Sequence, residues 1–174
     1  MSRAKCKSIK CKIRSEWQCI NITAVLIGAV VSLMLALMSA CLCGRFDLYG
    51  ELCLPDCAPA SFVFPIVWSL LYILIGAAAG AVVSNCDRCL CVHKNRGLLY
   101  FAVMFILSLL FSPVFFGAGL FFCGFVILAG VTVLCFFVII CFCRIYFICG
   151  AAMFVFWLWL VFMLYINLAV LFLN

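Results

Sequence analysis

No charged residue occurs between Gly97 and Cys143. This stretch is roughly twice as long as the ~20 apolar residues that cross a bilayer as one helix. A soluble domain carries roughly 25% charged residues, whereas this chain of 174 residues carries 9% and is 71% hydrophobic. A soluble fold of this size cannot hide so much apolar surface from water. Lipid is therefore the solvent, and the spans must be helices or a closed barrel.

The apolar runs are apolar on all sides, whereas barrel strands alternate apolar and polar residues. The sequence thus predicts an all-α membrane protein. Turn-forming proline and glycine residues between Ser112 and Gly119 divide the uncharged stretch into two spans. We expect a basic cytoplasmic tail at residues 1–19 and a five-helix transmembrane bundle at 20–174, with spans at about 20–43, 62–83, 98–116, 120–142 and 145–173.

The placement of basic residues agrees with five spans. Under that count the tail, the second loop and Arg144 share one side, which then holds ten of the eleven Lys and Arg residues. The other side holds Arg45 among acidic neighbours. Because basic loops stay cytoplasmic, we expect a cytoplasmic N-terminus and a C-terminus across the membrane. The net charge of +6 then points to the membrane surface, and we expect no nucleic-acid partner.

The predicted spans contain no Asp, Glu, Lys, Arg or His. Pumps and proton relays place such groups inside the membrane, so the sequence argues against an ion-coupled transporter. It also offers no buried general acid or base. We therefore expect a protein that is not an enzyme and needs no obligatory cofactor, and that binds apolar, flat or sterol-like ligands.

A short loop carries Cys86, Cys89, Cys91 and His93, four residues of types that bind zinc. Their spacing is not that of a standard zinc knuckle. Juxtamembrane cysteines are also candidates for S-palmitoylation, and buried thiols act as small hydrophobes. Incidental cysteines, acylation and a metal site all remain open for this loop.

Three spans carry stripes of residues at helical spacing. Trp68, Tyr72, Gly76 and Gly80 follow at four-residue steps, which indicates an aromatic wall above a close helix crossing, or ordinary bundle packing. The other two stripes are Ser108, Phe111, Ser112 and Phe115 on the third span, and Trp159, Met163 and Asn167 on the fifth.

Four segments in register resemble the translocator protein (TSPO) family of tryptophan-rich membrane receptors. They are Tyr49-x2-Leu52-x2-Pro55 followed by Pro59, Trp68-x2-Leu71-Tyr72-x3-Gly76, Ser108-x2-Phe111-Ser112-Pro113-x-Phe115-Phe116-Gly117, and Trp159-x2-Phe162-x4-Asn167. The resemblance covers about Tyr49 to the C-terminus. It implies a five-helix bundle that binds tetrapyrroles such as protoporphyrin and haem, or cholesterol, in a pocket under the first loop.

Carried over by position, the resemblance implies a pocket wall that includes Trp68, Trp159 and Asn167. The residues that replace the usual wall residues at neighbouring positions are Phe62, Phe111, Ser108 and Met163. Arg45 in the adjoining loop is a candidate partner for a propionate, since arginine suits carboxylates. The C-terminal sterol motif of the family needs a Tyr and a basic residue after Asn167, and Leu168 to Asn174 supply neither. We therefore expect a tetrapyrrole to bind better than cholesterol.

Three functions are compatible with these features. The first is a receptor or carrier for porphyrin, haem or a sterol, and the second is an acylated membrane protein that regulates partners without a ligand of its own. The third, degradation of bound porphyrin, is weakened because Cys57 replaces a loop tryptophan. The lipid bilayer is the expected environment, and a homodimer is a further candidate assembly. The resemblance points to the mitochondrial outer membrane or to a secretory-pathway membrane.

Overall fold

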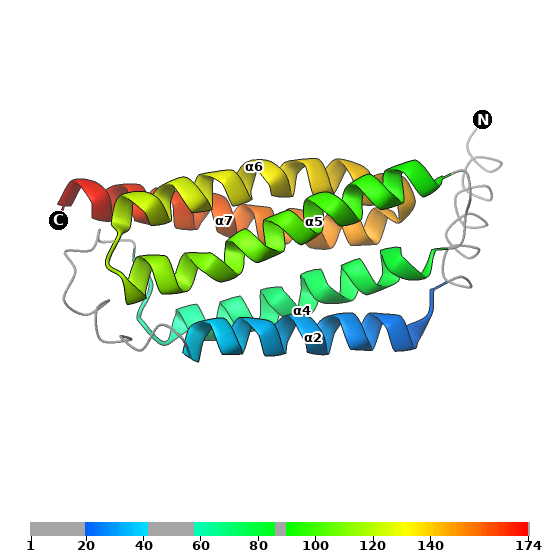
Figure 1. Cartoon of the computed structure of the whole chain (residues 1–174), viewed down its shortest axis with the longest axis horizontal. Helices are drawn as coiled ribbons and strands as arrows, with labels where there is room; N and C mark the ends of the chain where they lie inside the picture. Colours follow the sequence, from blue (N-terminus) through cyan, green and yellow to red (C-terminus); the bar gives the residue numbers. More distant parts are fainter. Residues whose placement is uncertain (1–19, 42–57, 86–89, 174) are drawn as a thin grey trace, which may run out of the picture.

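The computed structural model describes residues 20–41, 58–85 and 90–173. These residues form five helices, each long and apolar enough to cross a membrane, and they contain no β-strand. The five-helix prediction is confirmed (Figure 1). The helices are α2 (Ile22–Cys41), α4 (Val63–Ser84), α5 (Cys91–Ser112), α6 (Phe121–Ile145) and α7 (Phe147–Leu173), with a short π-helix, η2 (Pro113–Gly117), after α5.

The third helix begins earlier than the sequence predicts. We expected a span from about residue 98, but α5 begins at Cys91 and carries His93 and Lys94 in its first turn, with Arg96 close behind. Hydropathy finds where a helix enters lipid, whereas the hydrogen-bonded helix continues into the polar region beyond. For the same reason Arg144, expected in a turn between spans, lies in the last turn of α6.

The break between α5 and α6 falls where the sequence predicts it. At Pro113 the helix widens into η2, and the Ala118 N–H donates to the Pro113 carbonyl at 2.9 Å. Gly119 then adopts a positive φ of 66°, a conformation that glycine adopts without steric cost. Proline cannot donate a backbone hydrogen bond, so it begins the turn that Gly119 completes.

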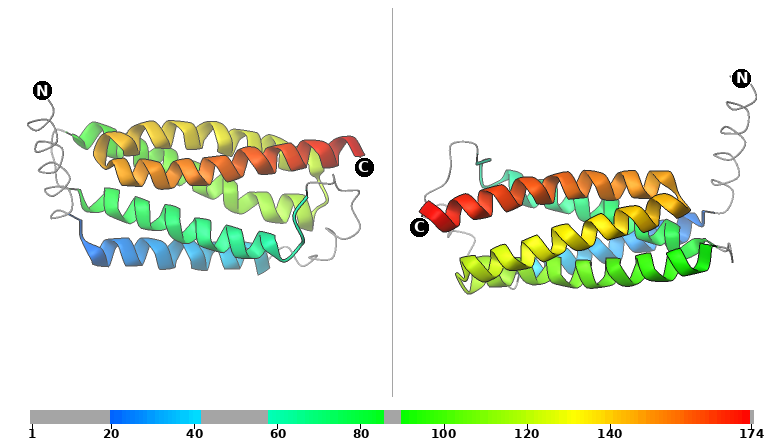
Figure 2. Two further views of the ribbon diagram at one scale, coloured as in Figure 1. Left: turned by 180° about the vertical axis from the view of Figure 1, so that it is seen from behind. Right: turned by 90° about the horizontal axis from the view of Figure 1, so that it is seen from above.

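The helices form an incomplete ring. α2 packs on α4, α4 on α7, α7 on α6 and α6 on α5, while α5 touches α2 and α4 only sparsely. Figures 1 and 2 show α2 and α4 as one layer and α6 and α7 as another, with α5 crossing between them. The sparse contacts leave a seam between α5 and the α2–α4 pair.

Small residues allow α2 and α4 to pack closely. A Cβ atom added to Gly76 would overlap the Gly28 carbonyl oxygen and the Ser32 hydroxyl, and one added to Gly80 would overlap the Ala24 carbonyl. The Ser32 hydroxyl donates to the Tyr72 carbonyl at 2.7 Å across the same interface. The tight crossing predicted at Gly76 and Gly80 is therefore confirmed.

Polar contacts hold the C-terminal end of α4. Lys94 Nζ donates to the carbonyl oxygens of Val83 and Asn85, both at 2.7 Å. Asn85 Nδ2 donates to the Tyr146 hydroxyl at 3.1 Å. The unpaired carbonyl groups that end a helix need such donors, so Lys94 ties the start of α5 to the end of α4.

Candidate functional site

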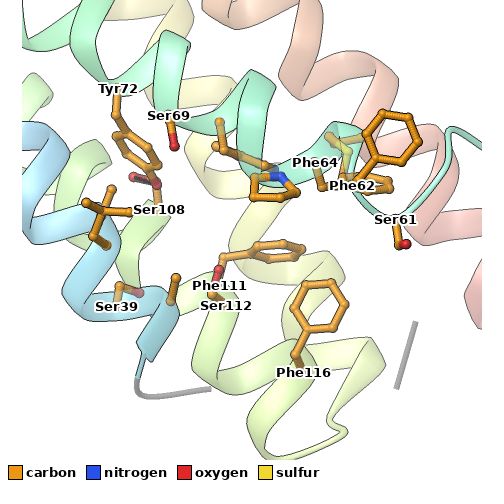
Figure 3. Close-up of a pocket in the computed structure, with 16 residues that line it drawn as sticks. Ser39, Ser61, Phe62, Phe64, Ser69, Tyr72, Ser108, Phe111, Ser112 and Phe116 are labelled. Carbon is orange, nitrogen blue, oxygen red and sulfur yellow. Dashed lines mark hydrogen bonds between the residues drawn. The ribbon is translucent and has the colours of Figure 1, made fainter. Parts of the chain in front are cut away.

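A cavity of about 460 Å³ lies where α2 ends, α4 begins and α5 ends (Figure 3). Its volume is typical of small-molecule pockets. Residues from α2, α4, α5, α7 and η2, and from the turn just before α4, line it: Ala36, Leu37, Ser39, Ala40, Ser61, Phe62, Phe64, Pro65, Trp68, Ser69, Tyr72, Ser108, Phe111, Ser112, Phe116 and Met163. The cavity thus occupies the seam between α5 and the α2–α4 pair, at the end of the bundle where α2 ends and α4 begins.

Aromatic rings form one wall of the cavity. Trp68 stacks on Tyr72 with ring centres 5.6 Å apart and on Phe111 with centres 6.5 Å apart, both at an interplanar angle of 28°. Trp68 and Tyr72 share a face because they are four residues apart on α4, while Phe111 approaches from α5. Phe116 continues the α5 side through an edge contact with Phe111 at 6.5 Å. A ligand in the cavity can therefore contact both the faces and the edges of these aromatic rings.

Hydroxyl groups interrupt the apolar lining at defined points. Tyr72 Oη donates to Ser108 Oγ at 3.2 Å, and Ser108 Oγ donates to the Phe105 carbonyl at 2.8 Å. Figure 3 shows this pair at one end of the cavity. Ser69 and Ser112 add two further hydroxyls. The described lining residues include no charged side chain. The cavity therefore suits a ligand that is largely uncharged and carries a few hydrogen-bonding groups.

The structure brings together five of the eight residues that the sequence predicts for the ligand site. They are Phe62, Trp68, Ser108, Phe111 and Met163. Arg45 lies outside the described residues. Trp159 and Asn167 do not line this cavity, and a ligand site that Trp68 shares with Trp159 stays a prediction.

Trp159 lies one ring away from the cavity. Phe64 lines the cavity and packs edge-on against Trp159 with centres 6.3 Å apart. The Trp159 Nε1–H is buried without a hydrogen-bond partner, as is the Oδ1 of Asn167, a residue only 2% exposed. Met163 lies between these two residues on the same face of α7. An unpaired donor and an unpaired acceptor thus flank the cavity-lining Met163.

Sequence reasoning missed the contribution of the first span. Ala36, Leu37, Ser39 and Ala40 of α2 line the cavity, but the resemblance to the family begins only after this helix. The small residues Ala36, Ser39 and Ala40 follow at helical spacing, which is the signal for a close helix approach. The predicted ligand site also lacked seven other residues that line the cavity: Ser61, Phe64, Pro65, Ser69, Tyr72, Ser112 and Phe116.

The cysteine loop that carries the candidate zinc ligands lies only partly within the described residues. Cys91 and His93 lie on the first turn of α5, while Cys86 and Cys89 lie outside the described residues. Within the part of the chain that the structure describes, no group of three or more candidate ligands comes together.

Comparison with known proteins identifies the family. The TspO/MBR family model matches residues 19–173. Protein CrtK from Rhodobacter capsulatus is 33% identical over 72 residues, which cover 40% of this chain and 42% of CrtK. The aligned part therefore spans less than half of that relative. The family match covers all five described helices, and the chain is a multi-pass membrane protein that belongs to the TspO/MBR family.

Proposed function

We propose that this protein is a membrane receptor or carrier whose cavity binds a flat, apolar ligand. The observation that carries the proposal is the cavity of about 460 Å³ with stacked aromatic rings and no charged side chain among its described lining residues. Ligand sites are typically apolar and aromatic, with a few placed polar groups. The Tyr72–Ser108 pair and the Ser69 and Ser112 hydroxyls supply such groups.

We further propose that a tetrapyrrole binds better than cholesterol. A planar conjugated macrocycle presents ring faces to Trp68 and Phe111, and aromatic contacts contribute about 0.5–1.5 kcal/mol each beyond area burial. Cholesterol has an aliphatic ring system, so its binding gains only the free energy of burying apolar surface. The chain also lacks the Tyr and basic residue of the family's sterol motif after Asn167.

The carboxylates of a tetrapyrrole need to stay outside the apolar lining, since an unpaired buried charge is costly. The cavity lies where α2 ends, and Arg45 follows Cys41, the last residue of α2, by four positions in the sequence. We propose that the propionates face this end and that Arg45 pairs with one of them. The macrocycle then lies deeper, against Trp68.

The test uses the purified full chain in lipid nanodiscs. Protoporphyrin is titrated while tryptophan emission is recorded, and cholesterol is then added as a competitor. We expect saturable quenching by protoporphyrin and displacement only at a large excess of cholesterol. Tight cholesterol binding without protoporphyrin binding would reverse the ranking. If neither ligand binds, the receptor proposal fails and a regulatory protein without its own ligand becomes the better account.

A further inference from the structure

The cavity lies in the least tightly packed part of the ring. On α2 it is lined by Ala36, Leu37, Ser39 and Ala40, and opposite them on α5 and η2 by Ser108, Ser112 and Phe116. We refer to the junction between these two sets as the α2–α5 seam. α2 is held chiefly by α4, and its contacts with α5 are sparse. The helix that forms the outer wall of the cavity therefore has little to hold it against α5.

The outer wall reaches the lipid-facing surface. Leu37 lines the cavity and is nevertheless 45% exposed on the surface of the bundle. Its neighbours Met34 and Met38 are exposed large apolar residues on the same helix. Because α2 lies in the membrane, this exposed surface meets acyl chains rather than water. Leu37 thus belongs both to the lining of the cavity and to the exposed apolar surface of α2.

A hydrogen bond crosses the seam beside the cavity. Ser39 Oγ on α2 donates to the backbone carbonyl of Leu109 on α5. Ala36 and Ala40 offer only methyl groups on the cavity side of α2, so they fill little of the junction. On the facing side η2 replaces regular α-helix at Pro113–Gly117, and π turns inside helices are frequent at functional sites.

We propose that the α2–α5 seam is a lateral portal, through which apolar molecules dissolved in the bilayer reach the cavity without passing through water. Leu37 forms the mouth of the portal, and the Ser39–Leu109 hydrogen bond holds it closed. The ligand class rests on the proposed function, whereas the opening toward lipid rests only on the geometry of α2 and α5.

The first experiment tests the opening without any added ligand. Trp17, Trp157 and Trp159 are replaced by Phe, which leaves Trp68 as the single tryptophan. The protein is placed in vesicles of phosphatidylcholine brominated in mid-chain, and quenching of Trp68 is measured. We expect bromines to quench Trp68 through the mouth, and Leu37→Phe to remove most of this quenching by filling it. Leu26→Phe is the matched control, since Leu26 is 60% exposed on α2 and does not line the cavity.

The portal is contradicted if Trp68 is not quenched, or if Leu37→Phe and Leu26→Phe have the same effect. Because no porphyrin is present, this result does not depend on the proposed function. If protoporphyrin does not bind, the proposed function is contradicted, but the quenching result still stands.

The second experiment tests the hydrogen bond across the seam. Protoporphyrin is first dissolved in nanodisc lipid, and its association and dissociation rates are followed by stopped flow. Ser39→Ala removes the bond between α2 and α5, so we expect both rates to rise about threefold to tenfold while affinity changes little. Ser32→Ala is the control, because it removes a matching α2 hydrogen bond, to Tyr72 of α4. Unchanged rates in Ser39→Ala, or equal changes in both variants, would overturn the proposal.

Discussion

The hydroxyl of Tyr72 on α4 donates to Ser108 Oγ on α5 across 3.2 Å, and both side chains are buried at one end of the cavity. Ser108 in turn donates to the Phe105 carbonyl of its own helix. The two hydroxyls therefore differ: the Tyr72 hydroxyl donates to Ser108, whereas the Ser108 hydroxyl donates to the Phe105 carbonyl. This asymmetry gives the two residues different energetic roles.

Removing Ser108 is expected to cost more stability than removing the Tyr72 hydroxyl. Ser108→Ala leaves a buried phenol without its acceptor, which costs about 1–3 kcal/mol. Tyr72→Phe removes the donor and leaves Ser108 bonded to Phe105, so we expect a loss of about 0.5–1 kcal/mol. Denaturant unfolding in mild detergent measures both. A larger loss in Tyr72→Phe would contradict this reading of the pair.

Gly76 and Gly130 form a matched pair of helical glycines. A Cβ at Gly76 would collide with backbone and side chain of α2, whereas one at Gly130 would meet nothing within 4 Å. We expect Gly76→Ala to lower the free energy of unfolding by about 1–3 kcal/mol through overpacking. Gly130→Ala is expected to be neutral or to stabilise by up to ~1 kcal/mol through helix propensity. Thermal unfolding of both variants checks this, and equal melting temperatures would refute the close α2–α4 crossing.

Lys94 is expected to stabilise the end of α4 rather than serve only as a surface charge. Lys94→Met keeps the apolar stem but removes the donor to the Val83 and Asn85 carbonyls. Hydrogen bonds to charged groups contribute about 1.5–3 kcal/mol, and partial exposure places the expected loss at the lower end. Arg96→Met removes an exposed charge on the same helix and should change stability by less than ~0.5 kcal/mol. Equal effects of the two changes on unfolding would contradict the capping role.

Most of the fold follows from hydropathy and turn chemistry. The uncharged stretch had to be split, and Pro113 and Gly119 lie where the chain turns. The start of α5 could not be located in this way, because the polar residues His93 to Arg96 lower the hydropathy of a segment that is nevertheless helical. Helical hydrogen bonds continue past the membrane boundary, and hydropathy does not record them.

The cavity was predictable only in part. Trp68, Phe111 and Ser108 fall on stripes that the sequence displays, and they meet because α4 and α5 face each other across the seam. The contribution of α2 depends on how three helices pack, which no single-helix pattern reports. Trp159 was expected on the same wall. It does not line this cavity, and its ring instead packs against Phe64, which does.

The two ends of the chain are expected on opposite sides of the membrane, with the N-terminus in the cytoplasm. Five spans require opposite sides. Lys94, Arg96 and Arg144, the Lys and Arg residues of the described chain, all lie at the end of the bundle where α5 begins and α6 ends. Accessibility of tags at both termini in intact membrane vesicles measures this directly. Two tags exposed on the same side would exclude an odd number of spans.

The most direct measurement of the central claim is the affinity of protoporphyrin for Trp68→Leu, with Trp157→Leu as the control. Trp157 stacks on Phe154 and does not line the cavity. Binding is followed by the Soret absorbance of protoporphyrin, so loss of a tryptophan does not affect the signal. Since each aromatic contact contributes about 0.5–1.5 kcal/mol, we expect Trp68→Leu to weaken binding about tenfold. Trp157→Leu should change it by less than about twofold. Equal affinities of the two variants would contradict the claim that this cavity is the ligand site.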